Sequence, residues 1–139
     1  MKCKMKKLLS QLKLDSTNNL ISLTLFGSYN TKHWYKNSSD IDILALVKQK
    51  DFNTEIEIED KYRNLLSEYF QYDNIHFTFI AMNNFDTLFA DIYIDYEDKI
   101  IFDIDLHYDF LMYISKYNRI NDNLIRLVRE DWESKYGVL

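Results

Sequence analysis

Two mostly apolar segments joined by a polar connection are the feature that most constrains how this chain folds. The first segment, 20–26, ends at Gly27, one of only two glycines in the chain, and the second, 41–47, follows Asp40. Short apolar runs of this kind are typical of strands, and the first is apolar enough to suggest burial on both faces. A glycine at a strand exit indicates a sharp turn or a close approach to a ligand, because both favour a residue without a Cβ.

Paired carboxylates open the second segment. Alternation along a strand places Asp40 and Asp42 on one face, with Ile41 and Ile43 on the other. Two carboxylates about 7 Å apart on one strand face repel each other unless a cation or a proton lies between them. Hard oxygen ligands suit Mg²⁺, which takes one or two carboxylates plus phosphate oxygens. The pattern therefore predicts a metal site at Asp40 and Asp42.

A family resemblance rests on the order of these parts. Gly27 and Ser28, a polar spacer and then the run Ser-Asp-Ile-Asp-Ile-Leu at 39–44 resemble the signature of the polymerase-beta-like nucleotidyltransferase superfamily. Within it, the chain is most similar to the minimal nucleotidyltransferases of bacteria and archaea, over about residues 20–103. The resemblance implies a small mixed β-sheet backed by helices, with the active site on its open face.

The same resemblance implies roles for individual residues. Gly27 and Ser28 would bind the triphosphate of a nucleotide through backbone N–H groups and the Ser hydroxyl, at a helix start whose dipole favours anions. Asp40 and Asp42 would hold Mg²⁺, as two ions that clamp the attacking and leaving oxygens, or as one ion if a third ligand is missing. The implied substrate is a nucleoside triphosphate, ATP by expectation.

The third carboxylate of the family, on a neighbouring strand, is replaced here. In the segment 75–80, alternation places His76 and Thr78 on one face and Ile75 and Phe77 on the other, so that His76 matches the position of that acid. Imidazole is a poor Mg²⁺ ligand, although a neutral His can act as a general base. Three interpretations stay open: His76 is the catalytic base, or the site binds nucleotide but turns over poorly, or His76 is a plain strand histidine and the third acid lies elsewhere.

The polar connection also differs from the family pattern, in which an Arg and a second Gly often follow the Gly-Ser pair. The segment 29–36 has neither. Lys32 or Lys36 could supply the missing charge for phosphate, or both could simply be exposed lysines. Ser39, directly before the acids, completes the set that we assign to nucleotide binding together with Gly27, Ser28 and Lys32.

The remaining elements follow from apolar spacing and capping residues. We expect helices over about 5–12 and 28–35, a helix that begins at a Thr54/Glu57 capping box, and another capped by Asn83 or Asn84. Two more helices are expected after 106, separated by a break near 118–123. Further strands are expected at 75–80 and 99–102. A second Asp-x-Asp, at Asp103 and Asp105, lies where a strand passes into a helix, and we interpret it as a helix start. The predicted fold is α/β (α+β), a single domain over 1–139 with C-terminal helices over about 106–135.

Composition narrows the possible partners and the compartment. Seventeen basic against 22 acidic residues give a net charge of -5, so no general affinity for nucleic acid is expected. The single cysteine, Cys3, excludes an intramolecular disulfide and fits a reducing compartment. No apolar run approaches the length of a membrane span, and the basic N-terminus lacks the features of a signal peptide, which favours a cytoplasmic protein.

Two functional hypotheses result. The first is a Mg²⁺-dependent nucleotidyltransferase that moves a nucleoside monophosphate, AMP by expectation, to a hydroxyl of a protein partner or a small molecule. Resemblance to the minimal nucleotidyltransferases implies that it is the antitoxin of a toxin–antitoxin pair, with a helical protein as partner. The alternative is a binding module of the same fold that is catalytically weakened at His76 and acts by protein–protein contact.

Overall fold

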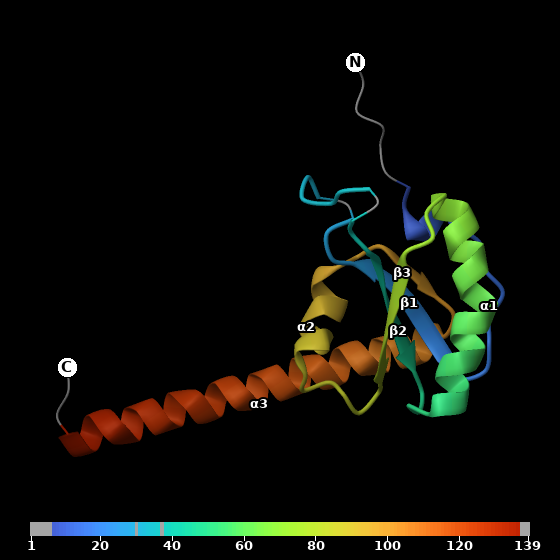
Figure 1. Cartoon of the computed structure of the whole chain (residues 1–139). Coiled ribbons are helices and arrows are strands. Elements are labelled where there is room, and N and C mark those ends of the chain that lie inside the picture. Colours follow the sequence, from blue (N-terminus) through green and yellow to red (C-terminus); the bar gives the residue numbers. More distant parts are fainter. Residues whose placement is uncertain (1–6, 30, 37, 137–139) are drawn as a thin grey trace.

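The computed structural model describes residues 7–29, 31–36 and 38–136 as a mixed four-stranded sheet packed between helices (Figure 1). The strands are β1 (Leu20–Phe26), β2 (Ile41–Val47), β3 (Ile75–Ala81) and β4 (Lys99–Ile101). The helices are the 3-10 helix η1 (Leu9–Gln11), α1 (Phe52–Phe70), α2 (Leu88–Asp95) and α3 (Ile104–Tyr136). The strand order is β3-β2-β1-β4; β1 is antiparallel to both β2 and β4, and β2 is parallel to β3. The predicted mixed sheet backed by helices is confirmed.

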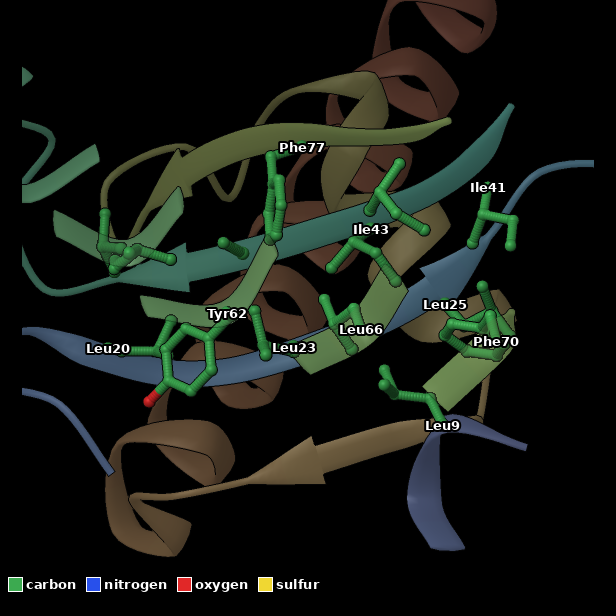
Figure 2. Packing of buried hydrophobic residues seen from close by; sticks show 14 of the residues in the cluster. Leu9, Leu20, Leu23, Leu25, Ile41, Ile43, Tyr62, Leu66, Phe70 and Phe77 are labelled. Carbon is green, nitrogen blue, oxygen red and sulfur yellow. The ribbon is translucent and has the colours of Figure 1, made fainter. Parts of the chain in front are cut away.

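One face of the sheet is covered by α1. Its residues Ile58, Tyr62, Leu66 and Phe70 repeat every four positions and are buried, as helical periodicity requires. Figure 2 shows three of them, together with Leu9 of η1, among the side chains that the strands contribute to this cluster. Those strand residues alternate along the sequence, and Leu23, Leu25, Ile41, Ile43, Ile75 and Phe77 belong to the set.

The other face is covered by α2 and the first turns of α3 (Figure 1). Leu44 and Leu46 of β2 pack there with Tyr93 of α2 and with Phe110 and Ile114 of α3. The central strands are therefore buried on both faces, which confirms the expectation for the segment 20–26. Ser22 and Thr24 are buried polar residues inside β1, whereas Asp42 lies near the start of β2, where the candidate site is.

A single helix occupies the C-terminal part of the chain, where two helices were predicted. α3 runs without a break through 118–123, because that interval contains Asn and Asp but neither Gly nor Pro to interrupt it. Asp103 Oδ1 accepts a hydrogen bond of 3.1 Å from the Leu106 N–H, so this acid caps α3 as predicted. Beyond the part that packs on the sheet, α3 extends away from the body of the molecule (Figure 1).

Helix starts elsewhere differ from the predictions. The expected N-terminal helix is reduced to η1, whose backbone N–H groups at Leu9 and Ser10 each donate to the Asp98 carboxylate at 2.7 Å; Met5, part of that prediction, lies outside the described residues. Helices this short gain little from their own hydrogen bonds, so this contact with a distant acid sets the local structure.

The predicted capping residues are also wrong at two helices. α1 begins one turn earlier than the Thr54/Glu57 capping box implies, with Asp51 at the N-cap and Thr54 already inside the helix. α2 begins at Leu88 after Thr87, because the Asn84 side chain turns back to accept a hydrogen bond of 2.8 Å from the Ala81 N–H. Local capping signals compete with such contacts, and the sequence alone does not rank them.

Candidate active site

The first part of the site is the turn that ends β1. Gly27 has a φ of +81°, a left-handed conformation that costs residues with a Cβ free energy. A Cβ built on Gly27 would lie 2.4 Å from Asp42 Oδ2, well inside van der Waals contact. The predicted turn is confirmed, and the close approach at Gly27 is to a side chain of this chain and not to a ligand. The group that approaches is the carboxylate of Asp42 on the neighbouring strand.

The second part is the start of β2. Antiparallel pairing sets Asp42 opposite Phe26, the residue just before Gly27, and alternation places Asp42 on the same face as Leu44 and Leu46. Its side chain is 26% exposed, so it is accessible from solvent while partly withdrawn from it. Burial raises the pKa of the Asp42 carboxyl, the imidazole of His76 opposes this, and the negative charge of Asp40 adds to it. A cation at this position favours the charged carboxylate.

Asp40 lies just before β2 and is held by three neighbours. Its Oδ1 accepts a hydrogen bond of 2.6 Å from the Asn74 side chain, and its carbonyl oxygen accepts one of 2.9 Å from Trp34 Nε1. The Tyr72 hydroxyl donates to the preceding carbonyl, that of Ser39, at 2.5 Å. Sequence reasoning missed Trp34, Tyr72 and Asn74. The available signal was an Asn directly before the predicted strand 75–80, one parallel strand away from the acids.

His76 lies beside Asp42. Parallel pairing of β2 with β3 places the two residues opposite each other, and His76 Nδ1 is 3.5 Å from Asp42 Oδ1. The His76 side chain is 62% exposed, whereas Ile75 and Phe77 are buried in the cluster under α1. The predicted alternation along this strand is confirmed, and His76 points to the same face as the acids.

The helix expected over 28–35 is absent from the described residues of this connection, which form turns. The Ser28 carbonyl accepts hydrogen bonds from the Thr31 N–H at 2.9 Å and from Thr31 Oγ1 at 2.7 Å. Trp34 packs edge-on against Tyr29 and Tyr72, with ring centroids 5.0 Å and 4.9 Å apart. These aromatic contacts and the Trp34 bond to Asp40 hold the segment against the body, so no helix dipole acts on an anion at Ser28. That part of the prediction is wrong.

The polar connection carries the other predicted nucleotide ligands. Lys32 is exposed, and Lys36 lines a surface pocket of about 680 Å³ that also borders Tyr72 and Asn74. Ser39 is half-buried; its Oγ accepts a hydrogen bond of 3.0 Å from the Tyr35 N–H, which leaves its own O–H able to donate. The structure thus brings Gly27, Asp40, Asp42 and His76 together, and fixes Ser39 next to them.

The carboxylate oxygens of this site fit a hard divalent cation. The carboxylate of Asp42 lies against the Gly27 turn, where a Cβ on residue 27 would collide with it. Because Asp42 is partly buried and Asp40 is near, two negative charges without a cation between them are unfavourable. Over the residues that the structure describes, no group of three or more His, Cys, Asp or Glu side chains is arranged to hold a metal ion. Two carboxylates suffice for Mg²⁺ when phosphate oxygens and water complete its shell.

Comparison with known proteins gives one match. The model of a nucleotidyltransferase domain family matches residues 2–135, nearly the whole chain. No curated protein and no solved structure matches the chain significantly. No helix in the described part of the chain is long and apolar enough to cross a membrane, α3 included.

Proposed function

Because this chain belongs to the nucleotidyltransferase domain family, we propose that it is a Mg²⁺-dependent enzyme that transfers AMP from ATP to a hydroxyl group. The observation that carries this proposal is the closure of the Gly27 turn on Asp42, with Asp40 and His76 alongside. That arrangement joins a tight backbone turn to two carboxylates that could hold Mg²⁺ beside phosphate oxygens, which supports nucleotidyl transfer.

The chain's own residues bind and orient the reactants in this proposal. The turn at Gly27 and Ser28 receives the triphosphate, the O–H of Ser39 donates to it, and Lys32 or Lys36 offsets its charge as a point cation. Asp40 and Asp42 hold the Mg²⁺, as one ion or as two. When bound, Mg²⁺ supplies positive charge that offsets the anionic transition state.

The reaction is an in-line displacement. The acceptor oxygen bonds to the α-phosphorus, the bond from that phosphorus to the bridging oxygen breaks, and pyrophosphate leaves. The acceptor proton has to move to a base, and we assign that role to His76, whose Nδ1 lies 3.5 Å from Asp42 Oδ1. By its resemblance to the minimal nucleotidyltransferases, we propose as acceptor a tyrosine or another hydroxyl of a helical toxin-type protein, with the chain as its antitoxin in the cytoplasm. A small-molecule acceptor is the other version.

A second candidate function rests on the same histidine. With His76 in place of a third carboxylate, and no cluster of three metal ligands over the described ranges, the site is weaker than a full three-acid centre. The fold would then bind nucleotide or a partner protein without turnover. This candidate differs from the first only in the chemical step, so binding and transfer have to be measured separately.

The test compares two Asp-x-Asp pairs in the same chain. The variant Asp40→Asn with Asp42→Asn removes the predicted site, and Asp103→Asn with Asp105→Asn is the matched control, because Asn can still cap α3. Binding of ATP with Mg²⁺ is measured by calorimetry, and transfer is measured with α-labelled ATP and a panel of tyrosine-containing proteins and sugars.

Each outcome of this test has one meaning. Binding and label transfer that only the Asp40/Asp42 variant loses support the enzyme. If the wild type binds ATP but transfers no label above background to any protein or sugar of the panel, the result supports the binding module. ATP binding that is equal in both variants would contradict a site at Asp40 and Asp42.

A further inference from the structure

An aromatic pair borders the candidate active site on the side away from His76. Phe26 is the last residue of β1, its register partner on β2 is Asp42, and the partner of Asp42 on β3 is His76. Side chains that pair across neighbouring strands lie on the same face of a sheet, so these three residues form one row. Neighbouring strands are about 5 Å apart, which places Phe26 one strand spacing from Asp42.

Tyr96 extends this row beyond Phe26. The two rings meet nearly edge-on, with centroids 6.2 Å apart and an angle of 74° between their planes. Phe26 is half-buried, whereas Tyr96 is 37% exposed. Part of an aromatic surface beside the site therefore faces solvent.

The backbone that carries the Tyr96 ring is fixed on both sides. Tyr96 directly follows α2, and its N–H donates to the Ile92 carbonyl at 3.1 Å. Its own carbonyl accepts a hydrogen bond from Lys99 Nζ. The Leu25 N–H donates to the Asp98 carbonyl at 2.9 Å, which ties the turn after α2 to the end of β1. A ring on a backbone held in this way loses little conformational freedom when it binds a flat ligand.

The chemistry of this surface fits a nucleobase. Aromatic side chains stack on bases through their π-faces, and this contact tolerates every base because each has such a face. Charge sets the orientation of a nucleotide at the site. Asp95 and Glu97, on either side of Tyr96 in the sequence, are exposed acids that repel a triphosphate. The base is therefore favoured at the aromatic pair and the phosphates at the Gly27 turn.

We propose that Tyr96 and Phe26 form the subsite for the base, and that the site takes purine nucleoside triphosphates, adenine and guanine alike. This inference rests on the proposed nucleotide site at Gly27, Asp40 and Asp42. The Tyr96 ring stacks on the base, and Phe26 supports that ring at its edge. Stacking depends on ring area, so the two fused rings of a purine bind more tightly than the single ring of a pyrimidine.

The test measures binding by calorimetry, with Mg²⁺ and the α,β-methylene analogues of ATP, GTP and CTP, in which carbon replaces the oxygen that transfer would release. Inorganic tripolyphosphate, which has no base, is the matched ligand control. Tyr96→Leu removes the ring but keeps an apolar side chain, and Tyr96→Trp enlarges the ring. Tyr108→Leu is the matched protein control, because Tyr108 is an exposed tyrosine of α3 whose ring contacts His107.

We expect Tyr96→Leu to weaken binding of the ATP and GTP analogues roughly tenfold, within the range of one base–aromatic contact, and to leave tripolyphosphate binding unchanged. Tyr96→Trp should bind both purine analogues more tightly than the wild type, a gain that a folding defect does not produce. The wild type should bind the CTP analogue several-fold more weakly than the purine analogues. Tyr108→Leu should bind every ligand as the wild type does.

The outcomes separate this inference from the proposed function. Purine binding that Tyr96→Leu leaves unchanged, or that Tyr96→Trp does not strengthen, overturns the subsite and leaves the nucleotide site standing. The subsite is also wrong if Tyr96→Leu loses tripolyphosphate equally, or if the CTP analogue binds as tightly as the purines. A wild type that binds neither the analogues nor tripolyphosphate overturns the proposed nucleotide site, and this subsite with it.

Discussion

The substitution Gly27→Ala separates the two roles that the structure gives this glycine. The backbone at Gly27 has a φ of +81°, and the added Cβ would meet Asp42 Oδ2 at 2.4 Å. The first feature affects stability, because an L-residue with a side chain is strained in the left-handed region. The second affects the site, because the carboxylate of Asp42 has to move to make room.

The stability cost follows from the backbone conformation. A left-handed residue with a Cβ costs about 1–2 kcal/mol, and the reduced freedom of Ala in the unfolded chain recovers only a fraction of that. Displacement of a partly buried carboxylate adds to the cost. We expect the free energy of unfolding to fall by about 1–2 kcal/mol and Tm by roughly 3–7 °C for a chain of this size.

Asn19→Ala is the matched control for this prediction. Asn19 has a φ of +71° and already has a Cβ, so its replacement by Ala tests the left-handed backbone without placing any atom against Asp42. Thermal unfolding and calorimetric binding of Mn²⁺ with ATP are measured for both variants. Both should melt earlier, and Gly27→Ala alone should lose binding. If Gly27→Ala melts like the wild type, the backbone reasoning is wrong; if it binds like Asn19→Ala, the close approach to Asp42 does not shape the site.

Three further predictions address single side chains. His76→Asp should raise Mn²⁺ affinity roughly tenfold in calorimetry, because it places a carboxylate where the imidazole now lies 3.5 Å from Asp42; unchanged affinity would show that position 76 does not reach the ion. Thr24→Val should raise the free energy of unfolding in urea by about 1 kcal/mol, because the buried Thr24 hydroxyl has no hydrogen-bond partner among the described residues, and a loss of stability would reveal one. Burial lowers the pKa of His107, so the stability from its neutral form is present above pH 6.5 and declines as the pH falls; His107→Gln should have a flatter profile in urea, and parallel profiles would contradict this.

The sheet was predictable from sequence because its strands obey simple alternation. β1 is mostly apolar because both of its faces are buried. On β3, Ile75 is buried and His76 is exposed, as alternation along one strand requires. In both strands the order of apolar and polar residues in the sequence is enough to predict which side chains are buried. The turn at Gly27 was predictable for the same reason, since a lone glycine at a strand exit has few other uses.

The connection between β1 and β2 was not predictable in this way. Its shape depends on contacts with residues far along the chain, such as Trp34 against Tyr72 and the Tyr72 hydroxyl on the Ser39 carbonyl. Helical propensity of the segment is middling, so tertiary contacts decide between a helix and turns. The same holds for η1, whose N–H groups bond to Asp98 almost ninety residues away, as their sequence separation of 88–89 shows.

The position of His76 shows most clearly where sequence reasoning ends. Alternation assigned it to a face, but only the parallel register of β2 with β3 places it opposite Asp42 rather than one pair away. That register places His76 beside the acids, as a base or a weakened site requires, and an inert histidine paired with Asp42, with the third acid elsewhere, fits the same contact. His76→Asp separates the first two interpretations. If turnover rises with metal affinity, the geometry is intact and only the third carboxylate was missing; if affinity rises and turnover falls, the imidazole itself accepts the proton.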